Sequence, residues 1–259
     1  MKDRLNSLGK RLFPWLVPAL LLFWWHWAVT SGSLSERVAP SPAAVLEAGW
    51  SLMRSGELFV HLWASFMRAM TGFLIGAGIG LFFGFINGGS KLSENLFDTT
   101  IQMVRNVPHL AMIPLVILWF GIDEGGKLFL VVLGTFFPIY VNTFHGIRSV
   151  DAGLVEMGRS YGLSRWQLFR QIILPGALPD ILVGVRYALG FMWLTLIVAE
   201  TISAPSGIGY MAMTAREFMQ TDIVVLAILL YALLGKLADS AARLLEARLL
   251  GWRQTFRPD

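Results

Sequence analysis

The chain contains no cysteine, which excludes disulfides, thiolate metal sites and cysteine nucleophiles. Charged residues are also scarce: they make up 15% of the 259 residues, whereas hydrophobic residues make up 55%. This balance is not that of an ordinary soluble domain. Long apolar stretches separated by short polar connections instead indicate a polytopic helical membrane protein, because helices satisfy their backbone hydrogen bonds internally.

The common motifs of catalysis and nucleotide binding are missing. The four histidines are too far apart to form a His-x-x-x-His metal site, and no G-x-S-x-G motif or defensible pair of catalytic carboxylates occurs. No G-x-x-x-x-G-K-[ST] loop is present, so the chain is not expected to hold ATP phosphates in the usual way. The sequence therefore predicts a chain that is not an enzyme, binds no metal and takes its energy from a partner.

Six apolar stretches predict transmembrane helices, so the expected fold class is all-α. They cover about residues 13–30, 66–87, 101–120, 128–147, 180–199 and 223–242. The last is expected to continue past Lys236. The first lacks a clean signal-peptidase site and is predicted to stay in the membrane. Shorter helices are predicted over residues 42–54 and 209–220.

Basic residues are distributed unevenly between the two sides of this predicted topology. Fourteen fall on the side that carries both termini: Lys2, Arg4, Lys10, Arg11, Lys91, Arg148, Arg159, Arg165, Arg170, Lys236, Arg243, Arg248, Arg253 and Arg257. Four fall on the opposite side: Arg37, Arg54, Lys127 and Arg216. The positive-inside rule therefore places both termini in the cytoplasm. This orientation explains the basic residues better than nucleic-acid binding does.

A polar insert over residues 148–176 carries signals for two short helices on the same side as the termini. Asp151 can cap a first helix, and Gly162 is suited to end it in a left-handed conformation. Ser164 and Gln167 form a capping-box pattern that starts a second helix. The sequence therefore predicts two helices that meet at a glycine.

The second helix of the insert has an apolar stripe that includes Trp166 and Phe169. Pro175 is predicted to end this helix, and Pro179 to begin the next one. The alternative interpretation is an ordinary cytoplasmic loop with an amphipathic helix on its surface.

The spacing within the insert resembles the EAA loop of ABC-importer permeases, through which a permease subunit docks onto a separate ATPase. Glu156 is followed six residues later by Gly162, and an Ile-x-Leu-Pro ending closes the pattern. Met157 and Gly158 replace the two alanines of that pattern, and both are compatible with a packed helix face. The resemblance implies that the following residues couple the chain to an ATPase: Glu156, Met157, Gly158, Ser160, Tyr161, Gly162, Leu163, Phe169, Ile172, Leu174 and Pro175.

The second predicted span carries glycine at every fourth position. These residues include Gly72, Gly76, Gly80 and Gly84. Such spacing places small residues on one ridge of a helix, where another helix can approach closely. We therefore predict tight helix packing along this ridge, although the same face could also slide during gating.

Three basic residues are predicted to lie nearest to membrane depth: Arg68, Arg105 and Arg186. Arg105 and His109 share one helix face near Asn106 and could line an aqueous pathway that favours an anion. The alternative is that Arg105 reaches the cytoplasmic interface and His109 is a packing residue. Arg186 could face the cavity or pair with a neighbouring acid, and Glu200 is expected at the outer mouth, too far along the helix to be that acid.

Similarity to a known family extends beyond the insert to nearly the whole chain. Residues 55–58, 101–111, 113–122 and 193–204 look like the aliphatic-sulfonate permeases of bacterial ABC importers, which group with taurine, nitrate and thiamine-precursor permeases. The resemblance implies a type I (MetI-like) permease fold in the bacterial inner membrane, with alternating access driven by ATP. It also implies a homodimer, two cytoplasmic ATPase subunits that bind ATP and Mg, and a periplasmic substrate-binding protein.

The expected organisation has three parts and no cofactor bound by this chain. Residues 1–60 form a tail, the first span and a periplasmic amphipathic segment; residues 61–245 form the permease domain, with the coupling loop at 151–176; residues 246–259 form a cytoplasmic tail. No internal repeat is evident, so a two-fold transporter would need two copies. Two alternatives remain: the same machine importing taurine, nitrate or another small solute, and an ion-coupled secondary transporter, which would need coupling acids at mid-membrane.

Overall fold

The computed structural model describes residues 13, 16–35 and 39–252, without the side chains of His109, Leu110 and Ser203. The predicted N-terminal tail, Arg37 and the last residues of the C-terminal tail therefore lie outside the described residues. The described chain is helical and contains no strand within these ranges, which confirms the all-α class.

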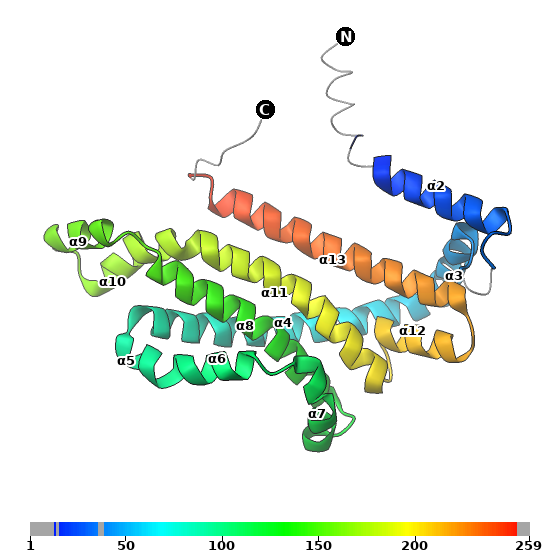
Figure 1. The fold of residues 1–259 in the computed structure, drawn as a ribbon, viewed down its shortest axis with the longest axis horizontal. Helices are drawn as coiled ribbons and strands as arrows, with labels where there is room; N and C mark the ends of the chain where they lie inside the picture. Colours follow the sequence, from blue (N-terminus) through cyan, green and yellow to red (C-terminus); the bar gives the residue numbers. More distant parts are fainter. Residues whose placement is uncertain (1–12, 14–15, 36–38, 253–259) are drawn as a thin grey trace, which may run out of the picture.

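Four long helices run side by side along the length of the molecule (Figure 1). They are α4 (Glu57–Gly89), α8 (Glu124–Arg148), α11 (Leu174–Ser203) and α13 (Thr221–Leu249). Each is long and apolar enough to cross a membrane. A shorter apolar helix, α2 (Leu16–Thr30), matches the described part of the predicted first span. The last helix continues past Lys236, as predicted.

Shorter helices connect these spans. The predicted helices over 42–54 and 209–220 correspond to α3 (Pro42–Ser55) and α12 (Ile208–Glu217). Both lie at the end of the molecule opposite the insert (Figure 1). At the insert end, α4 is followed by α5 (Lys91–Ser93) and by the π-helical segment η2 (Glu94–Asp98).

The predicted third span, residues 101–120, is not one helix. It is divided into α6 (Thr99–Arg105), the 3₁₀ turn η3 (His109–Met112) and α7 (Ile113–Phe120). The helix ends before Pro108 because proline lacks a backbone N–H and disfavours the helical conformation in the residue before it. The break lets α7 turn away from α6 (Figure 1).

The predicted end of the second insert helix at Pro175 is wrong. α10 (Arg165–Leu168) continues through the π-helical segment η4 (Phe169–Ile173) into α11, and Pro179 lies inside this helix rather than at its start. In a regular α-helix the ring of Pro175 would press on the carbonyl group four residues earlier. The wider π turn just before Pro175 relieves this clash, so the helix is not interrupted.

The glycine ridge of α4 faces α8. A Cβ atom at Gly72 would lie 2.5 Å from Val131 Cγ1, and one at Gly84 would lie 2.6 Å from Thr143 Cβ. The two glycines between them meet α8 in the same way, Gly76 and Gly80. Side chains at these positions would therefore force the two helices apart.

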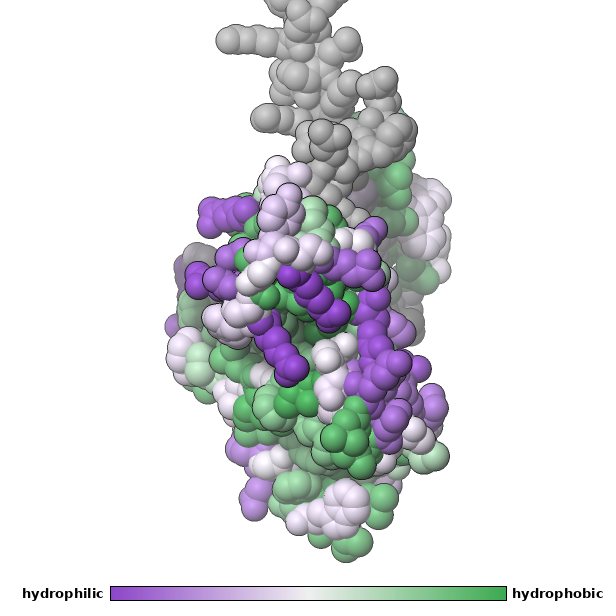
Figure 2. All heavy atoms as spheres, turned by 90° about the vertical axis from the view of Figure 1, so that its left-hand side faces the viewer, coloured by the Kyte–Doolittle hydropathy of each residue, from purple (hydrophilic) through white to green (hydrophobic). Residues whose placement is uncertain are grey.

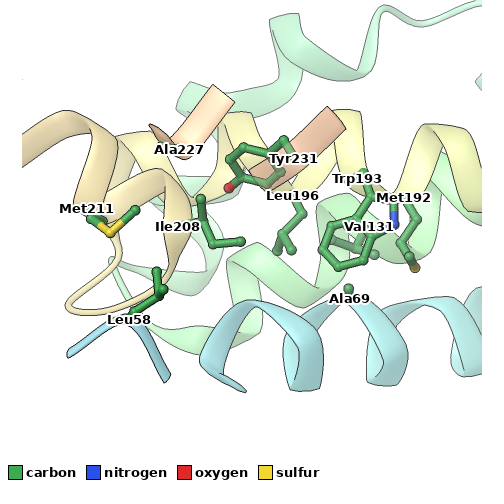
Figure 3. Packing of buried hydrophobic residues seen from close by; sticks show 10 residues of the cluster. All are labelled: Leu58, Ala69, Val131, Met192, Trp193, Leu196, Ile208, Met211, Ala227 and Tyr231. Atoms are coloured by element: carbon green, nitrogen blue, oxygen red, sulfur yellow. The ribbon is translucent and has the colours of Figure 1, made fainter. Parts of the chain in front are cut away.

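The insert projects from one end of the helix bundle as α9 (Ala152–Ser160) and α10 (Figure 1). Figure 2 shows that hydrophilic side chains are spread over this end of the molecule, with hydrophobic ones between them. The main buried cluster lies toward the opposite end (Figure 3), where α4, α8, α11, α12 and α13 contribute Leu58, Ala69, Val131, Met192, Trp193, Leu196, Ile208, Met211, Ala227 and Tyr231. The bundle therefore holds the insert at the end remote from this core.

Candidate functional site

The first helix of the insert begins and ends as the sequence predicts. The Asp151 carboxylate accepts hydrogen bonds from the backbone N–H groups of Gly153 and Leu154, at 2.7 and 3.2 Å. At the other end Gly162 has φ +76°, and its N–H donates to the Arg159 carbonyl at 2.9 Å. A further bond runs from the next N–H back to Gly158, which completes a Schellman motif.

The second helix starts with the predicted capping box. Ser164 Oγ accepts from the Gln167 N–H at 3.3 Å, and Gln167 Oε1 accepts from the Ser164 N–H at 2.9 Å. Only Tyr161, Gly162 and Leu163 separate α9 from Ser164. The turn between the two helices is therefore fixed by backbone–backbone hydrogen bonds on one side and by the side-chain–backbone bonds of the capping box on the other.

Gly158 lies between the two helices and lets them pack closely. A Cβ atom there would be 2.6 Å from Ile172 Cδ1 and 2.8 Å from Leu168 Cδ1. Phe169 then joins the insert to the bundle, because its ring stacks on Trp166 and meets Phe85 of α4 edge-on, with centroids 5.8 and 5.6 Å apart. The insert is thus a small packed unit attached to the bundle.

The outer side of the insert exposes large apolar side chains. Leu154 is 49% exposed, Met157 48%, Tyr161 82% and Trp166 67%. Met157 therefore lies on this exposed side, unlike Gly158 on the packed face. Charged residues surround the apolar ones, namely Glu156, Arg159, Arg165 and Arg170, all exposed. Apolar side chains within a polar rim are typical of a protein–protein interaction surface.

The predicted coupling residues divide between this surface and the packing beneath it. The exposed ones are Glu156, Met157, Ser160, Tyr161 and Gly162; the buried or partly buried ones are Gly158, Leu163, Phe169, Ile172, Leu174 and Pro175. The structure therefore brings all of them into one unit, with one group available to a partner and the other shaping it.

The predicted pathway residues occupy two separate places. Arg105 and Asn106 are exposed at the end of α6, close to the middle of α8 and α11, while the side chain of His109 lies outside the described part. Arg186 donates from Nε to Asp239 Oδ1 of α13 at 2.7 Å, so it pairs with a neighbouring acid. Glu200 is near the end of α11 remote from the insert. The predicted pathway roles of these residues remain predictions.

Glu200 is fully enclosed in a polar network rather than facing a cavity in this conformation. Its carboxylate accepts hydrogen bonds from Arg68 Nη1 at 2.9 Å and from the Tyr231 hydroxyl at 3.1 Å. Ser65 Oγ lies 2.8 Å from each of the two carboxylate oxygens and donates to them. Arg68 also forms a two-bond pair with Glu124 at the start of α8, at 2.6 and 2.8 Å. The network ties four long helices together.

The same network fixes the loop before α12. The N–H groups of Gly207, Ile208 and Gly209 donate to His61 Nδ1 at 3.1 Å, to Ser65 Oγ at 2.8 Å and to Glu200 Oε2 at 3.0 Å. The sequence singled out Arg68 and Glu200 separately but gave no signal for their pairing, because they are 132 residues apart. Within the described ranges, no three acidic or histidine side chains come together as metal ligands.

Comparisons with known proteins agree with this architecture. Residues 72–251 match the family model described as "Binding-protein-dependent transport system inner membrane component". The chain is 63% identical over 246 residues, 95% of its own length and 94% of the relative's, to the Escherichia coli (strain K12) protein named "Putative aliphatic sulfonates transport permease protein SsuC". It is 37% identical over 238 residues, 90% and 86% of the two lengths, to the taurine transport system permease protein TauC of the same organism.

A solved structure shares the fold. The crystal structure of an amino acid ABC transporter with histidines superposes with a TM-score of 0.63 at 19% identity, over 77% of this chain and 97% of that one. At this level of identity the match concerns the fold alone.

Proposed function

The chain belongs to the family of binding-protein-dependent transport system inner membrane components, and from this membership we propose that it is the permease subunit of an ATP-driven importer of aliphatic sulfonates. The substrate class is inferred from one observation: the chain is 63% identical, over nearly the full length of both chains, to a protein named as an aliphatic sulfonates transport permease.

The insert is the proposed contact with a cytoplasmic ATPase. Its exposed apolar side chains, held on two helices that a Schellman turn and a capping box fix together, support this assignment. In this proposal the ATPase binds ATP and Mg and hydrolyses the nucleotide, while this chain binds no cofactor and is not catalytic. The insert and both termini then lie in the cytoplasm, as the distribution of basic residues favours.

The proposed assembly has two copies of this chain, two ATPase subunits and one periplasmic substrate-binding protein, in the lipid of the inner membrane. A single copy has no internal repeat from which to build a two-fold pathway. In the proposed mechanism of alternating access, ATP binding closes the ATPase pair, the two inserts move with it, and the spans open outward to receive the sulfonate. Hydrolysis returns them to the inward-open arrangement.

Single-cysteine crosslinking tests the ATPase contact, and the cysteine-free sequence makes it simple. Tyr161→Cys would carry a maleimide–benzophenone crosslinker at the tip of the insert, and Phe218→Cys would carry it at the opposite end. The two positions are comparably exposed, at 82% and 71%. We expect illumination to join Tyr161→Cys, and not Phe218→Cys, to the ATPase subunit in the assembled complex. The reverse pattern would contradict the proposed docking.

A second candidate function is taurine import, which the 37% identity to a taurine permease favours. ATP-driven uptake by the reconstituted complex, supplied in turn with purified binding proteins for alkanesulfonates and for taurine, distinguishes the two. Uptake with the alkanesulfonate protein alone supports the proposal. An ion-coupled secondary transporter would instead purify without an ATPase and would transport solute without ATP.

A further inference from the structure

A hollow lies beside the middle of three spanning helices, and we call it the central hollow. One cavity of about 600 Å³ opens between α11 and α13, with Arg186 and Asp239 in its wall. A second of about 390 Å³ opens between α6, α8 and α11, with Arg105 in its wall. Tyr187 and Phe191 line both cavities and are four residues apart on one face of α11, so the two cavities adjoin along this face.

The central hollow has an excess of positive charge. The side chain of Arg105 makes no hydrogen bond or ion pair with any residue in the described part of the chain. Asp239 is the only acid among the lining residues, and it already serves three cations: Arg186 at 2.7 Å, Arg243 at 2.9 Å and Lys236 at 3.7 Å. This carboxylate is therefore shared by three cationic side chains, and the guanidinium of Arg105 adds a positive charge that has no acidic partner in the described part of the chain.

This charge indicates what the central hollow faces. Charged side chains at the middle of a membrane span are costly in contact with lipid tails, and they face a water-filled cavity or the interior of an assembly. Arg105 lines its cavity together with Gly134, Pro138 and Asn142, which lie near the middle of α8. It is therefore beside mid-span, and not at the cytoplasmic interface to which it could otherwise reach.

The remaining lining suits the apolar part of a small organic anion. Tyr187 and Phe191 are 60% and 49% exposed and present their rings to both cavities. A guanidinium group donates several hydrogen bonds in a fixed geometry that matches oxyanions, whereas aromatic rings provide apolar contact area. A cavity with a mostly apolar wall and few polar groups is the usual form of a small-molecule site.

We propose that the central hollow is a binding site for the transported anion inside the permease, with Arg105 holding the sulfonate group and the alkyl chain lying against Tyr187 and Phe191. The Arg186–Asp239 pair forms the other wall, and Asp239 is also paired with Lys236 and Arg243, so this wall presents no free carboxylate to an anion. This inference rests on the proposed function for the identity of the anion. The site itself depends only on the unpaired arginine and the lining described above.

The test measures binding and transport separately. The assembled complex in nanodiscs is titrated with radiolabelled ethanesulfonate in the absence of binding protein, and ATP-driven uptake is measured in proteoliposomes. We compare the wild type with Arg105→Gln, Arg105→Lys and, as a control, Arg216→Gln, whose arginine in α12 contacts Met213 at the far end of the molecule.

We expect Arg105→Gln to weaken ethanesulfonate binding and to slow uptake by about tenfold or more, which corresponds to about 1.4 kcal/mol. Arg105→Lys keeps the positive charge, so we expect its ethanesulfonate binding and uptake to fall only a few-fold. Such residual binding would also show that the substituted site still folds. Arg216→Gln should behave as the wild type. Unchanged binding in Arg105→Gln, or an equal loss in Arg216→Gln, would overturn the site.

Two further outcomes separate this inference from the proposed function. Binding that depends on Arg105 in a complex without ATP-driven sulfonate uptake would refute the proposed function and leave the site standing. Nanodiscs of phosphatidylcholine alone are compared with discs that contain phosphatidylglycerol, because a lipid phosphate could occupy the same arginine. Equal ethanesulfonate binding in both supports the site, and its abolition by the anionic lipid would assign Arg105 to a headgroup instead.

Discussion

The turn of the insert depends on a backbone conformation that only Gly162 adopts easily, so substitutions there should uncouple ATP hydrolysis from transport. Its φ of +76° lies in the left-handed region, and an ideal Cβ atom at this position would meet nothing within 4 Å. Crowding therefore makes no contribution. The whole penalty of a side chain comes from the backbone, roughly 1–2 kcal/mol for an ordinary residue and more for a β-branched one.

A penalty of this size changes the population of the correct turn considerably. One to two kcal/mol lowers the ratio of the native insert to its distorted forms by about 5- to 30-fold. Asparagine tolerates the left-handed region better than other residues that carry a Cβ atom. We therefore expect Gly162→Asn to retain most of the coupling, Gly162→Ala to lose part of it and Gly162→Val to lose most of it.

The measurement is the number of sulfonate molecules imported per ATP hydrolysed by the complete complex in proteoliposomes. Thermal unfolding of each variant serves as the control, since the turn lies far from the main buried cluster and the midpoint should hardly change. If Gly162→Val couples as well as the wild type, the insert does not transmit the work of the ATPase through this turn. If Gly162→Asn fails as badly as valine, the defect comes from a side chain at the partner surface, and the backbone argument is refuted.

Two further predictions concern the bundle. Gly84→Leu should lower the stability of the detergent-solubilised protein by about 1–3 kcal/mol, because the new side chain overpacks against α8. Gly78→Leu on the same helix should not, since a Cβ atom at that position meets nothing within 4 Å. Equal unfolding midpoints for the two variants would contradict the close approach of α4 and α8. Glu200→Ala should lower the free energy of unfolding by about 3 kcal/mol, because Arg68 stays buried with one carboxylate fewer. Glu217→Ala, at the exposed end of α12, should change the free energy of unfolding little. A destabilisation of Glu200→Ala below 1 kcal/mol, measured by the same unfolding assay, would show that the buried pair does not hold the loop.

Local signals in the sequence predicted the insert well. The aspartate cap, the left-handed glycine and the capping box each act within four or five residues, so their geometry follows from short-range rules. The glycine spacing on α4 likewise predicted close helix packing from the local sequence alone, although only the structure identifies α8 as the helix that the glycines face.

The features that the sequence did not predict depend on longer-range or competing effects. Proline normally ends a helix, but the π turn before Pro175 lets it continue, and nothing in the sequence around residues 169–173 indicates that turn. The apolar run at 101–120 hid the break at Pro108, since hydrophobicity alone does not distinguish one span from two short helices. Arg68 and Glu200 pair across the bundle, which no periodic pattern reveals.

The helix from Arg165 to Ile202 is continuous, so the insert and the region of Glu200 belong to one element of secondary structure. Its α-helical part, α11, has 30 residues and is about 45 Å long at 1.5 Å per residue. A swing of about 5° at the insert end of α11 would carry the other end sideways by about 4 Å, by the geometry of a rod of that length. Because Glu200 near this other end is hydrogen-bonded to Arg68, such a displacement would be passed directly to α4.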